Sequence, residues 1–260
     1  MRSGEDAGRA RIAGFDVIRG FSVVSMVGFH LCYDLAFIEG VALPWFRPPL
    51  QDIWRATISW TFLLVAGIMC SHSRSNLKRA GRYLGVAAAI YVVTLVAAVD
   101  TPISFGIIYC MGASTLLAWL VERAGAWPRT APALATCAVV LATAFLACLQ
   151  VPSGRFGLGW LGGPWVAVPP APFESGALSW LGFPGPGFAS GDYYPPLPFS
   201  LLYLAGVAVG RMMATSGTPK FLERLSCPAL EWVGRHALPV YVIHQPILLA
   251  ATMLLAARLG

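Results

Sequence analysis

Residues 11–38, RIAGFDVIRGFSVVSMVGFHLCYDLAFI, decide the fold, because they combine an apolar run long enough to enter a bilayer with several ionisable side chains. On a helix of about 100° per residue, Arg19 lies roughly 20° to one side of His30. Asp16 and Asp34 lie roughly 40° to its other side. One narrow polar stripe therefore runs along an otherwise apolar helix.

The stripe has two interpretations. An ionisable group inside a membrane helix is costly, so it normally faces a bundle interior or a watery cavity. For Asp16 and Arg19, an ion pair that anchors the helix at the membrane surface explains the pattern as well as a site does. His30 lies ~16 Å along the axis from Arg19, near mid-bilayer. A functional site is therefore the better explanation for His30 and Asp34.

The composition points to an integral membrane protein. The chain has 260 residues, of which 57% are hydrophobic and 12% charged, and a soluble domain carries about twice that charged fraction. The apolar runs are near 20 residues long and do not alternate, which favours helices over a barrel. The six cysteines show no paired spacing, so neither a disulfide framework nor a metal site is implied. Nucleotide-binding loop motifs do not occur in the sequence, and we expect no nucleic-acid partner.

The fold class predicted from these patterns is an all-α, polytopic membrane helical bundle. Its seven candidate spans are residues 18–38, 54–71, 83–99, 104–121, 131–150, 198–214 and 237–257. A cytoplasmic N-terminus places 14 of the 18 basic residues on the inner side of the membrane and only 4 on the outer side. We therefore expect residues 1–14 to form a cytoplasmic tail before a retained first span. Residues 15–260 are then a single transmembrane domain.

A long outer loop, residues 151–197, connects the fifth and sixth spans. Loops of this length are usually functional or disordered, and its Trp and Tyr residues argue against disorder. These aromatic side chains either lie in the interfacial belt or belong to a lid that stacks on a substrate at the outer face. The candidate substrate-binding residues are Trp160, Trp165, Asp192 and Tyr193.

The inner side carries a cationic segment, residues 73–82 (SRSNLKRAGR), between the second and third predicted spans. Topology alone explains its four basic residues. The functional alternative is a phosphate clamp, because Arg and Lys bind phosphates through charge-assisted hydrogen bonds. Its candidate residues are Lys78, Arg79 and Arg82.

A second histidine, His244, lies about two turns into the last span and is followed by Gln245 and Pro246. Gln245 or an adjacent backbone carbonyl could satisfy the imidazole. A structural histidine and a ligand-facing one are equally compatible with the sequence.

Five segments, spread over nearly the whole chain from residue 11, carry a family resemblance. They are RIAGFDVIRGFSVVSMVGFH (11–30), FLLVAGI (62–68), PISFGIIYCMG (102–112), GDYYPPLPFSLLYLAGVAVGR (191–211) and EWVGRHALPVYVIHQPILL (231–249). Together they resemble the heparan-α-glucosaminide N-acetyltransferase catalytic-domain family in its short bacterial form. Related transmembrane acyltransferases share the opening and the ending.

The resemblance implies a multi-pass protein of a bacterial-type plasma membrane that takes acetyl-CoA from the cytoplasm. It would acetylate an extracytoplasmic acceptor, often a sugar, at an amine or hydroxyl. His30 would be the catalytic base or the transient acetyl carrier, and Asp34 would hold its tautomer. The residues expected to bind acetyl-CoA are Arg19, Lys78, Arg79, Arg82 and His244. No metal is implied.

Two departures from the family leave alternatives open. Lysosomal relatives have Asn at the position of His30 and a catalytic His later, whereas this chain has no His between residues 31 and 71. Tyr109 stands where relatives commonly have His. Two alternatives therefore stay open: the chain acts on a different acceptor substrate, or it is an inactive family member. The formation of a homodimer is also left open by the sequence. A small proton-coupled transporter or flippase is the non-enzyme alternative, because intramembrane His and Asp also suit a proton relay.

Overall fold

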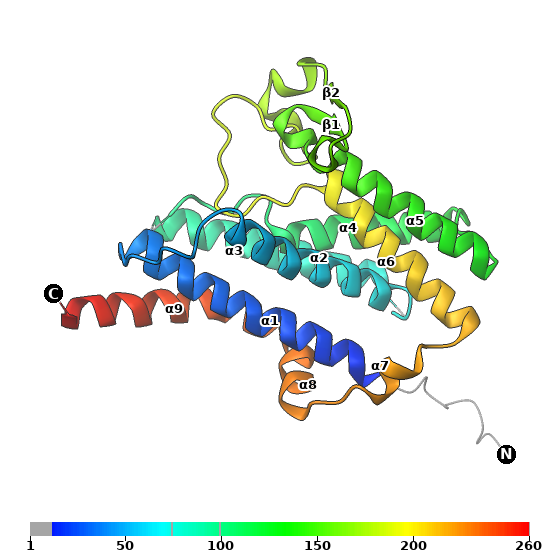
Figure 1. Ribbon diagram of the computed structural model, residues 1–260, viewed down its shortest axis with the longest axis horizontal. Coiled ribbons are helices and arrows are strands. Elements are labelled where there is room, and N and C mark those ends of the chain that lie inside the picture. The colour runs from blue at the N-terminus through cyan, green and yellow to red at the C-terminus, as the bar shows by residue number, and fades with distance from the viewer. Residues whose placement is uncertain (1–11, 74, 99, 260) are drawn as a thin grey trace. The chain divides into compact units, whose positions relative to one another are not determined.

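The computed structural model describes residues 12–73, 75–98 and 100–259 (Figure 1). Most of the predicted cytoplasmic tail, residues 1–11, lies outside the described residues, as does Arg74 of the cationic segment. The chain forms two compact units: residues 1–62 with 218–260, and residues 63–217. They are called the first and second unit below, and each is described by itself.

Long helices make up most of both units. They are α1 (Ala13–Tyr33), α2 (Leu50–Cys70), α3 (Asn76–Ala97), α4 (Ile107–Arg123), α5 (Ala131–Cys148), α6 (Pro196–Ser216) and α9 (Ala237–Leu259). Six of the described helices are long and apolar enough to cross a membrane. The other long one, α4, has 17 residues. The all-α membrane bundle is confirmed, and the seven-span topology stays a prediction.

The helix bounds agree with the predicted spans to within a few residues, except in α3. This helix begins at Asn76, seven residues before the predicted start, and so contains most of the cationic segment. The reason is that Lys, Arg, Ala and Leu are good helix formers, while a search for apolar runs ignores the charged ones. Lys78, Arg79 and Arg82 therefore lie on the first two turns of a helix.

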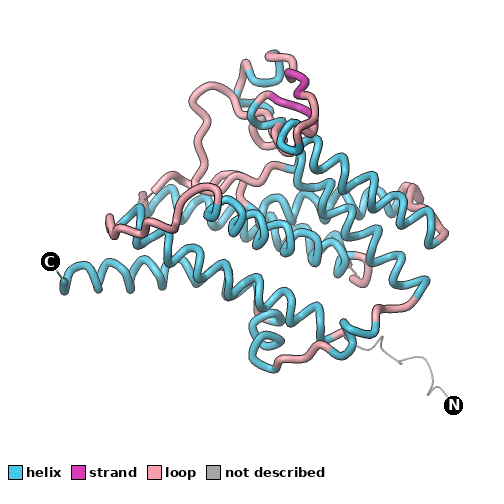
Figure 2. The backbone as a smooth tube through the Cα atoms, in the orientation of Figure 1, coloured by secondary structure: helices cyan, strands magenta, loops and turns pink. Residues whose placement is uncertain are grey.

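Several short elements complete the chain. A π-helical turn, Asp34–Ile38, continues α1, and the helices α7 (Lys220–Arg224) and α8 (Pro228–Arg235) precede α9. In the outer loop, strands β1 (Arg155–Gly157) and β2 (Trp165–Ala167) pair antiparallel (Figure 2). The loop also contains the 3₁₀ turns Val151–Ser153, Gly159–Leu161, Ala171–Phe173 and Gly176–Leu178.

In the first unit, α8 packs closely against α1 (Figure 1). Gly20 of α1 faces the Leu230 carbonyl, and Gly234 of α8 faces the Asp16 carbonyl. A Cβ at either glycine would overlap backbone atoms of the other helix. Small residues are what allow membrane-protein helices to approach so closely. The opening and closing family-like segments are thus joined directly.

In the second unit, the same device joins the end of α2 to α6. Gly67 faces the Tyr203 carbonyl, and Gly206 faces the Leu64 carbonyl. The Thr115 and Tyr203 hydroxyls, 2.8 Å apart, also link α4 to α6 through a buried hydrogen bond. Two further family-like segments, in α2 and α6, are therefore packing partners.

Candidate functional site

Two histidines from opposite ends of the chain meet in the first unit. His30 of α1 and His244 of α9 have ring centroids 5.0 Å apart, with an angle of 61° between the ring planes. His244 is buried, with 8% of its surface exposed, while His30 is partly exposed. The sequence singled out both residues, and the fold brings them together.

A hydrogen bond joins the same two segments next to the histidines. Gln245 Nε2 donates to Asp34 Oδ1 over 2.8 Å, and Asp34 is fully buried. Asp34 begins the π-helical turn, and such turns occur frequently at functional sites. The contact with Gln245 is a partner of Asp34 that the sequence did not indicate. The predicted role of Asp34 toward His30 stays a prediction.

The His244 ring is held by its own helix. Its Nδ1 lies 2.6 Å from the Tyr241 carbonyl oxygen, so an adjacent carbonyl satisfies the imidazole, as one of the sequence-based alternatives stated. Its Nε2 atom is buried, and so is Gln245 Oε1. Neither atom has a hydrogen-bond partner in the described part of the chain.

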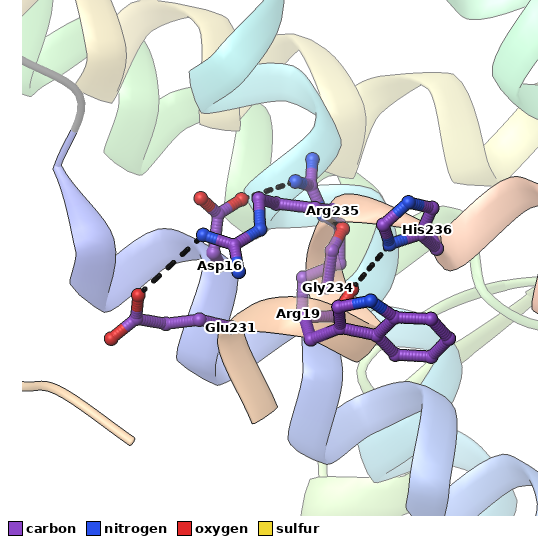
Figure 3. A network of polar contacts seen from close by, with 7 residues as sticks. Asp16, Arg19, Glu231, Gly234, Arg235 and His236 are labelled. Carbon is purple, nitrogen blue, oxygen red and sulfur yellow. Dashed lines mark hydrogen bonds and ion pairs between the residues drawn. The ribbon is translucent and has the colours of Figure 1, made fainter. Parts of the chain in front are cut away.

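At the other end of the polar stripe, Asp16 and Arg19 form an ion pair. Arg19 Nη2 lies 2.5 Å from Asp16 Oδ1, and Arg19 Nε donates to the Gly234 carbonyl over 2.7 Å. Figure 3 shows this pair beside the Glu231–Arg235 pair of α8, whose closest N–O distance is 3.8 Å. Arg19 thus ties α1 to the last turn of α8. Its predicted role in acetyl-CoA binding stays a prediction.

The cationic segment presents two different environments in the second unit. Lys78 and Arg82 are exposed, and Arg79 is half-buried. Arg79 Nε donates to the Tyr83 hydroxyl over 3.2 Å, and Tyr203 also lies close enough to interact electrostatically. In the part of the chain that the structure describes, Arg79 has no carboxylate partner. Its guanidinium is therefore suited to an anion such as phosphate.

Asp192 stabilises the start of α4 in the second unit. Its Oδ2 accepts a hydrogen bond of 3.0 Å from the backbone N–H of Ile107, the first residue of α4. It satisfies one of the N–H groups that every helix start leaves without an intrahelical partner. Ser190 Oγ accepts from Ser104 N over 3.0 Å in the same connection. A helix cap explains Asp192, and its predicted contact with substrate stays a prediction.

Tyr193 belongs to an aromatic cluster beside this cap. Its ring lies 5.0 Å from Phe188, and its hydroxyl donates to the Ser179 carbonyl over 2.6 Å. Burial, followed by the nearby Tyr109, raises the pKa of Tyr193 to about 12. Tyr109, where relatives commonly have His, lies 5.1 Å from the Phe105 ring in the same cluster. Residue 109, at which the chain departs from its relatives, therefore lies near Tyr193, a residue predicted to bind the acceptor substrate.

The two predicted tryptophans lie near the strand pair. Trp160 is 43% exposed, and its Nε1 donates to the Leu146 carbonyl over 3.3 Å. Trp165 is 38% exposed and packs its ring against Gly159. Partly exposed rings suit an interfacial belt and sugar stacking alike. Their role as acceptor contacts stays a prediction.

The sequence indicated the candidate site residues better than it indicated which residues they contact. Helical periodicity placed the polar stripe on α1, but it contains no signal for which helix faces that stripe. Gln245 follows His244 directly in the Y-x-I-H-Q-P ending, which was the available indication that it belongs to the site. Tyr83, one turn after Arg79, gave a similar i,i+4 signal.

Searches of curated proteins and of solved structures found no match. The family model described as "Heparan-alpha-glucosaminide N-acetyltransferase, catalytic" matches residues 11–246. This range covers nearly the whole chain and includes both histidines, Asp34 and Gln245. The chain therefore belongs to the heparan-alpha-glucosaminide N-acetyltransferase catalytic family, and it is a membrane protein of acyltransferase type.

Proposed function

We propose that the protein transfers an acetyl group from cytoplasmic acetyl-CoA to an extracytoplasmic acceptor of sugar type. The observation that carries the proposal is the contact between His30 and His244, with ring centroids 5.0 Å apart. Both residues belong to helices long and apolar enough to cross a membrane. Ionisable residues at such positions normally mark a functional site.

His30 is the residue that we assign to the acetyl group. It is the more accessible of the two histidines, and imidazole is the commonest side chain for proton transfer in catalysis. It serves either as the base for the incoming nucleophile or as a transient acetyl carrier. Asp34, one turn further along α1, would orient it.

Arg79 is the best-supported residue for the CoA phosphates. A half-buried guanidinium with no carboxylate partner among the described residues can gain charge-assisted hydrogen bonds from a phosphate. Lys78 and Arg82 lie on the same helical turns and are exposed, so they would add charge around it. Arg19 already contacts Asp16 and Gly234, which makes it a weaker candidate for the same task.

The acceptor is expected at the outer loop, residues 151–197. Trp160 and Trp165 expose ring surface there, and aromatic rings offer large apolar faces at modest entropic cost. Shortening residues 156–190 should then reduce acetyl transfer and leave acetyl-CoA affinity nearly unchanged. A collapse of donor binding would show instead that the loop is structural.

The donor assignment is tested with labelled acetyl-CoA. An Arg79→Gln/Arg82→Gln variant should bind it more weakly than the wild type, while it inserts into membranes to the same extent. Arg129→Gln is the matched control, because Arg129 is an exposed cation outside α3. If the correctly inserted double variant binds acetyl-CoA with unchanged affinity, the two arginines serve only to set the orientation of the protein in the membrane.

The direction of transfer rests on the predicted orientation. It is tested with single cysteines introduced at Ser175 and Ser75 in a chain whose six native cysteines have been replaced. A membrane-impermeant thiol reagent added from outside should label residue 175 and not residue 75. The opposite labelling pattern would contradict the orientation and the direction of transfer together.

A further inference from the structure

Two buried hydrogen-bond acceptors lie on adjacent residues of α9. The first is Nε2 of His244. Its Nδ1 lies 2.6 Å from the Tyr241 carbonyl, and a carbonyl oxygen can only accept, so Nδ1 must carry the hydrogen. In the neutral imidazole, Nε2 then presents a lone pair.

The second acceptor is Oε1 of Gln245. The amide donates through Nε2 to Asp34 Oδ1 over 2.8 Å, which fixes the orientation of the amide group. The other amide atom, Oε1, is an acceptor that can take up to two hydrogen bonds. Like His244 Nε2, it is buried and has no partner within the described residues.

Such atoms are rare in folded proteins. Most buried polar atoms have a partner, and leaving one unsatisfied costs free energy. His244 is more than nine-tenths buried, and the partly exposed His30 ring lies beside it. Each of these two acceptors, on consecutive residues, is therefore available to an incoming O–H or N–H group.

We propose that His244 Nε2 is the proton acceptor for the nucleophile of the acceptor substrate, and that Gln245 Oε1 helps to orient that nucleophile. This inference rests on the proposed acetyl transfer and assigns the base to a residue other than His30. His30 is then left to face the acetyl group.

The oxygen or nitrogen of the nucleophile forms a bond to the acetyl carbon, and its proton moves to His244 Nε2. The bond from the acetyl carbon to the CoA sulfur breaks. If His30 carries the acetyl group, its ring nitrogen has first displaced the CoA thiolate, which takes the proton that the ring loses, and the bond that breaks in this step is the one from the acetyl carbon to His30. The electron pair of the broken bond goes to the leaving atom. That atom then takes the proton from His244, which returns to its neutral form.

The kinetic test uses the purified full chain, acetyl-CoA, and two nucleophile probes, glucosamine and hydroxylamine. His244→Ala and His244→Asn should each lower kcat, measured at saturating acetyl-CoA, by ~10²–10⁴-fold, the usual contribution of a general base. Added imidazole should restore part of the activity of His244→Ala. A purely structural histidine would not respond to the small base.

His236→Ala is the matched control. His236 also holds a carbonyl through Nδ1, 2.9 Å from the Trp232 oxygen, but it is exposed and outside the histidine pair. Its kcat should equal that of the wild type. A His244→Ala variant that binds acetyl-CoA and keeps the wild-type kcat, or that imidazole does not rescue, would overturn the inference. A wild type that transfers acetyl to neither probe would overturn the proposed function as well.

A second measurement does not depend on activity. Nitrogen NMR of protein labelled at its four histidines, assigned by comparison with His244→Asn, reports which ring nitrogen carries the hydrogen. The inference requires a protonated Nδ1 and a bare Nε2 at His244. A hydrogen on Nε2 of the neutral ring would contradict it, even if acetyl transfer itself were established.

Discussion

Gln245 Nε2 donates a hydrogen bond of 2.8 Å to Asp34 Oδ1, which links the last membrane helix to the end of the first. Asp34 is fully buried, so water does not replace this bond readily. The histidine contact lies one turn earlier on α1. These two contacts set the register of α1 against α9 and thereby position the candidate site.

A double-mutant cycle measures the Asp34–Gln245 contact. Asp34→Ala and Gln245→Ala should each lower the free energy of unfolding in detergent, and the double variant should lose less than the sum. The expected coupling is about 0.5–1.5 kcal/mol, the range for hydrogen bonds inside proteins and membranes. Combining Gln245→Ala with Asp52→Ala, at an exposed residue, should be additive. Additive losses in the first cycle would show that the bond contributes nothing.

Removing one partner of the buried ion pair at the start of α1 should cost much more stability than removing one partner of an exposed pair of the same spacing. Arg19–Asp16 and Arg55–Asp52 are both three residues apart, with side chains 18% and 4% exposed in the first pair and 61% and 55% in the second. Arg19→Ala should cost about 3–5 kcal/mol, because it removes a directly bound cation from a carboxylate whose side chain is only 4% exposed. Arg55→Ala should cost under about 1 kcal/mol. Denaturant unfolding of both variants decides, and equal losses would contradict the interpretation.

Close packing of α2 on α6 predicts opposite effects for two glycine substitutions. Gly67→Ala should destabilise by about 1–3 kcal/mol, because its Cβ would overlap the Tyr203 carbonyl. Gly85→Ala in α3 meets no described atom within 4 Å, and should stabilise by about 0.5–1 kcal/mol through helix propensity. Thermal unfolding in detergent measures both. A neutral Gly67→Ala would mean that the helices separate easily.

Tyr193 gives a prediction for alkaline pH. Its pKa is about 12 in the folded protein, against about 10 for an ordinary tyrosine. A raised pKa means that the stability contribution is complete below pH ~10 and is lost as the pH rises through about 12. Up to pH ~11, the tyrosinate absorbance of Tyr193→Phe should therefore nearly match that of the wild type. A titration step of one tyrosine with its midpoint near pH 10, present in the wild type and absent from Tyr193→Phe, would contradict the raised pKa of this partly buried phenol.

Hydrophobic runs predicted most of the fold because a membrane span is a local property of the sequence. The predicted span 131–150 corresponds to α5, Ala131–Cys148, with an error of two residues. The short helix α8 was not predicted: it has only eight residues, and its stability comes from packing against α1. Such tertiary contacts leave little trace in a single sequence.

For the candidate site too, local features of the sequence were predicted and tertiary contacts were not. Helical geometry placed His30 and Asp34 on one stripe, and the chemistry of a buried histidine drew attention to His244. Whether these residues lie in contact depends on how α1 packs against α9. Helical periodicity gives no information about that packing. The hydrogen bond from Ile107 N–H to Asp192 was likewise not indicated by the sequence, because it joins residues 85 positions apart. The predicted contact of Asp192 with substrate stays a prediction.

The rate of acetyl transfer from acetyl-CoA by His30 variants shows whether His30 takes part in the reaction. His30→Ala removes the imidazole, and His30→Asn keeps much of its volume and some hydrogen bonding, so together they separate chemistry from packing. Both should fold, bind acetyl-CoA and turn over at least ~10²-fold more slowly than the wild type. If both variants fold, bind acetyl-CoA and still turn over near the wild-type rate, His30 is a structural histidine and has no catalytic role in acetyl transfer.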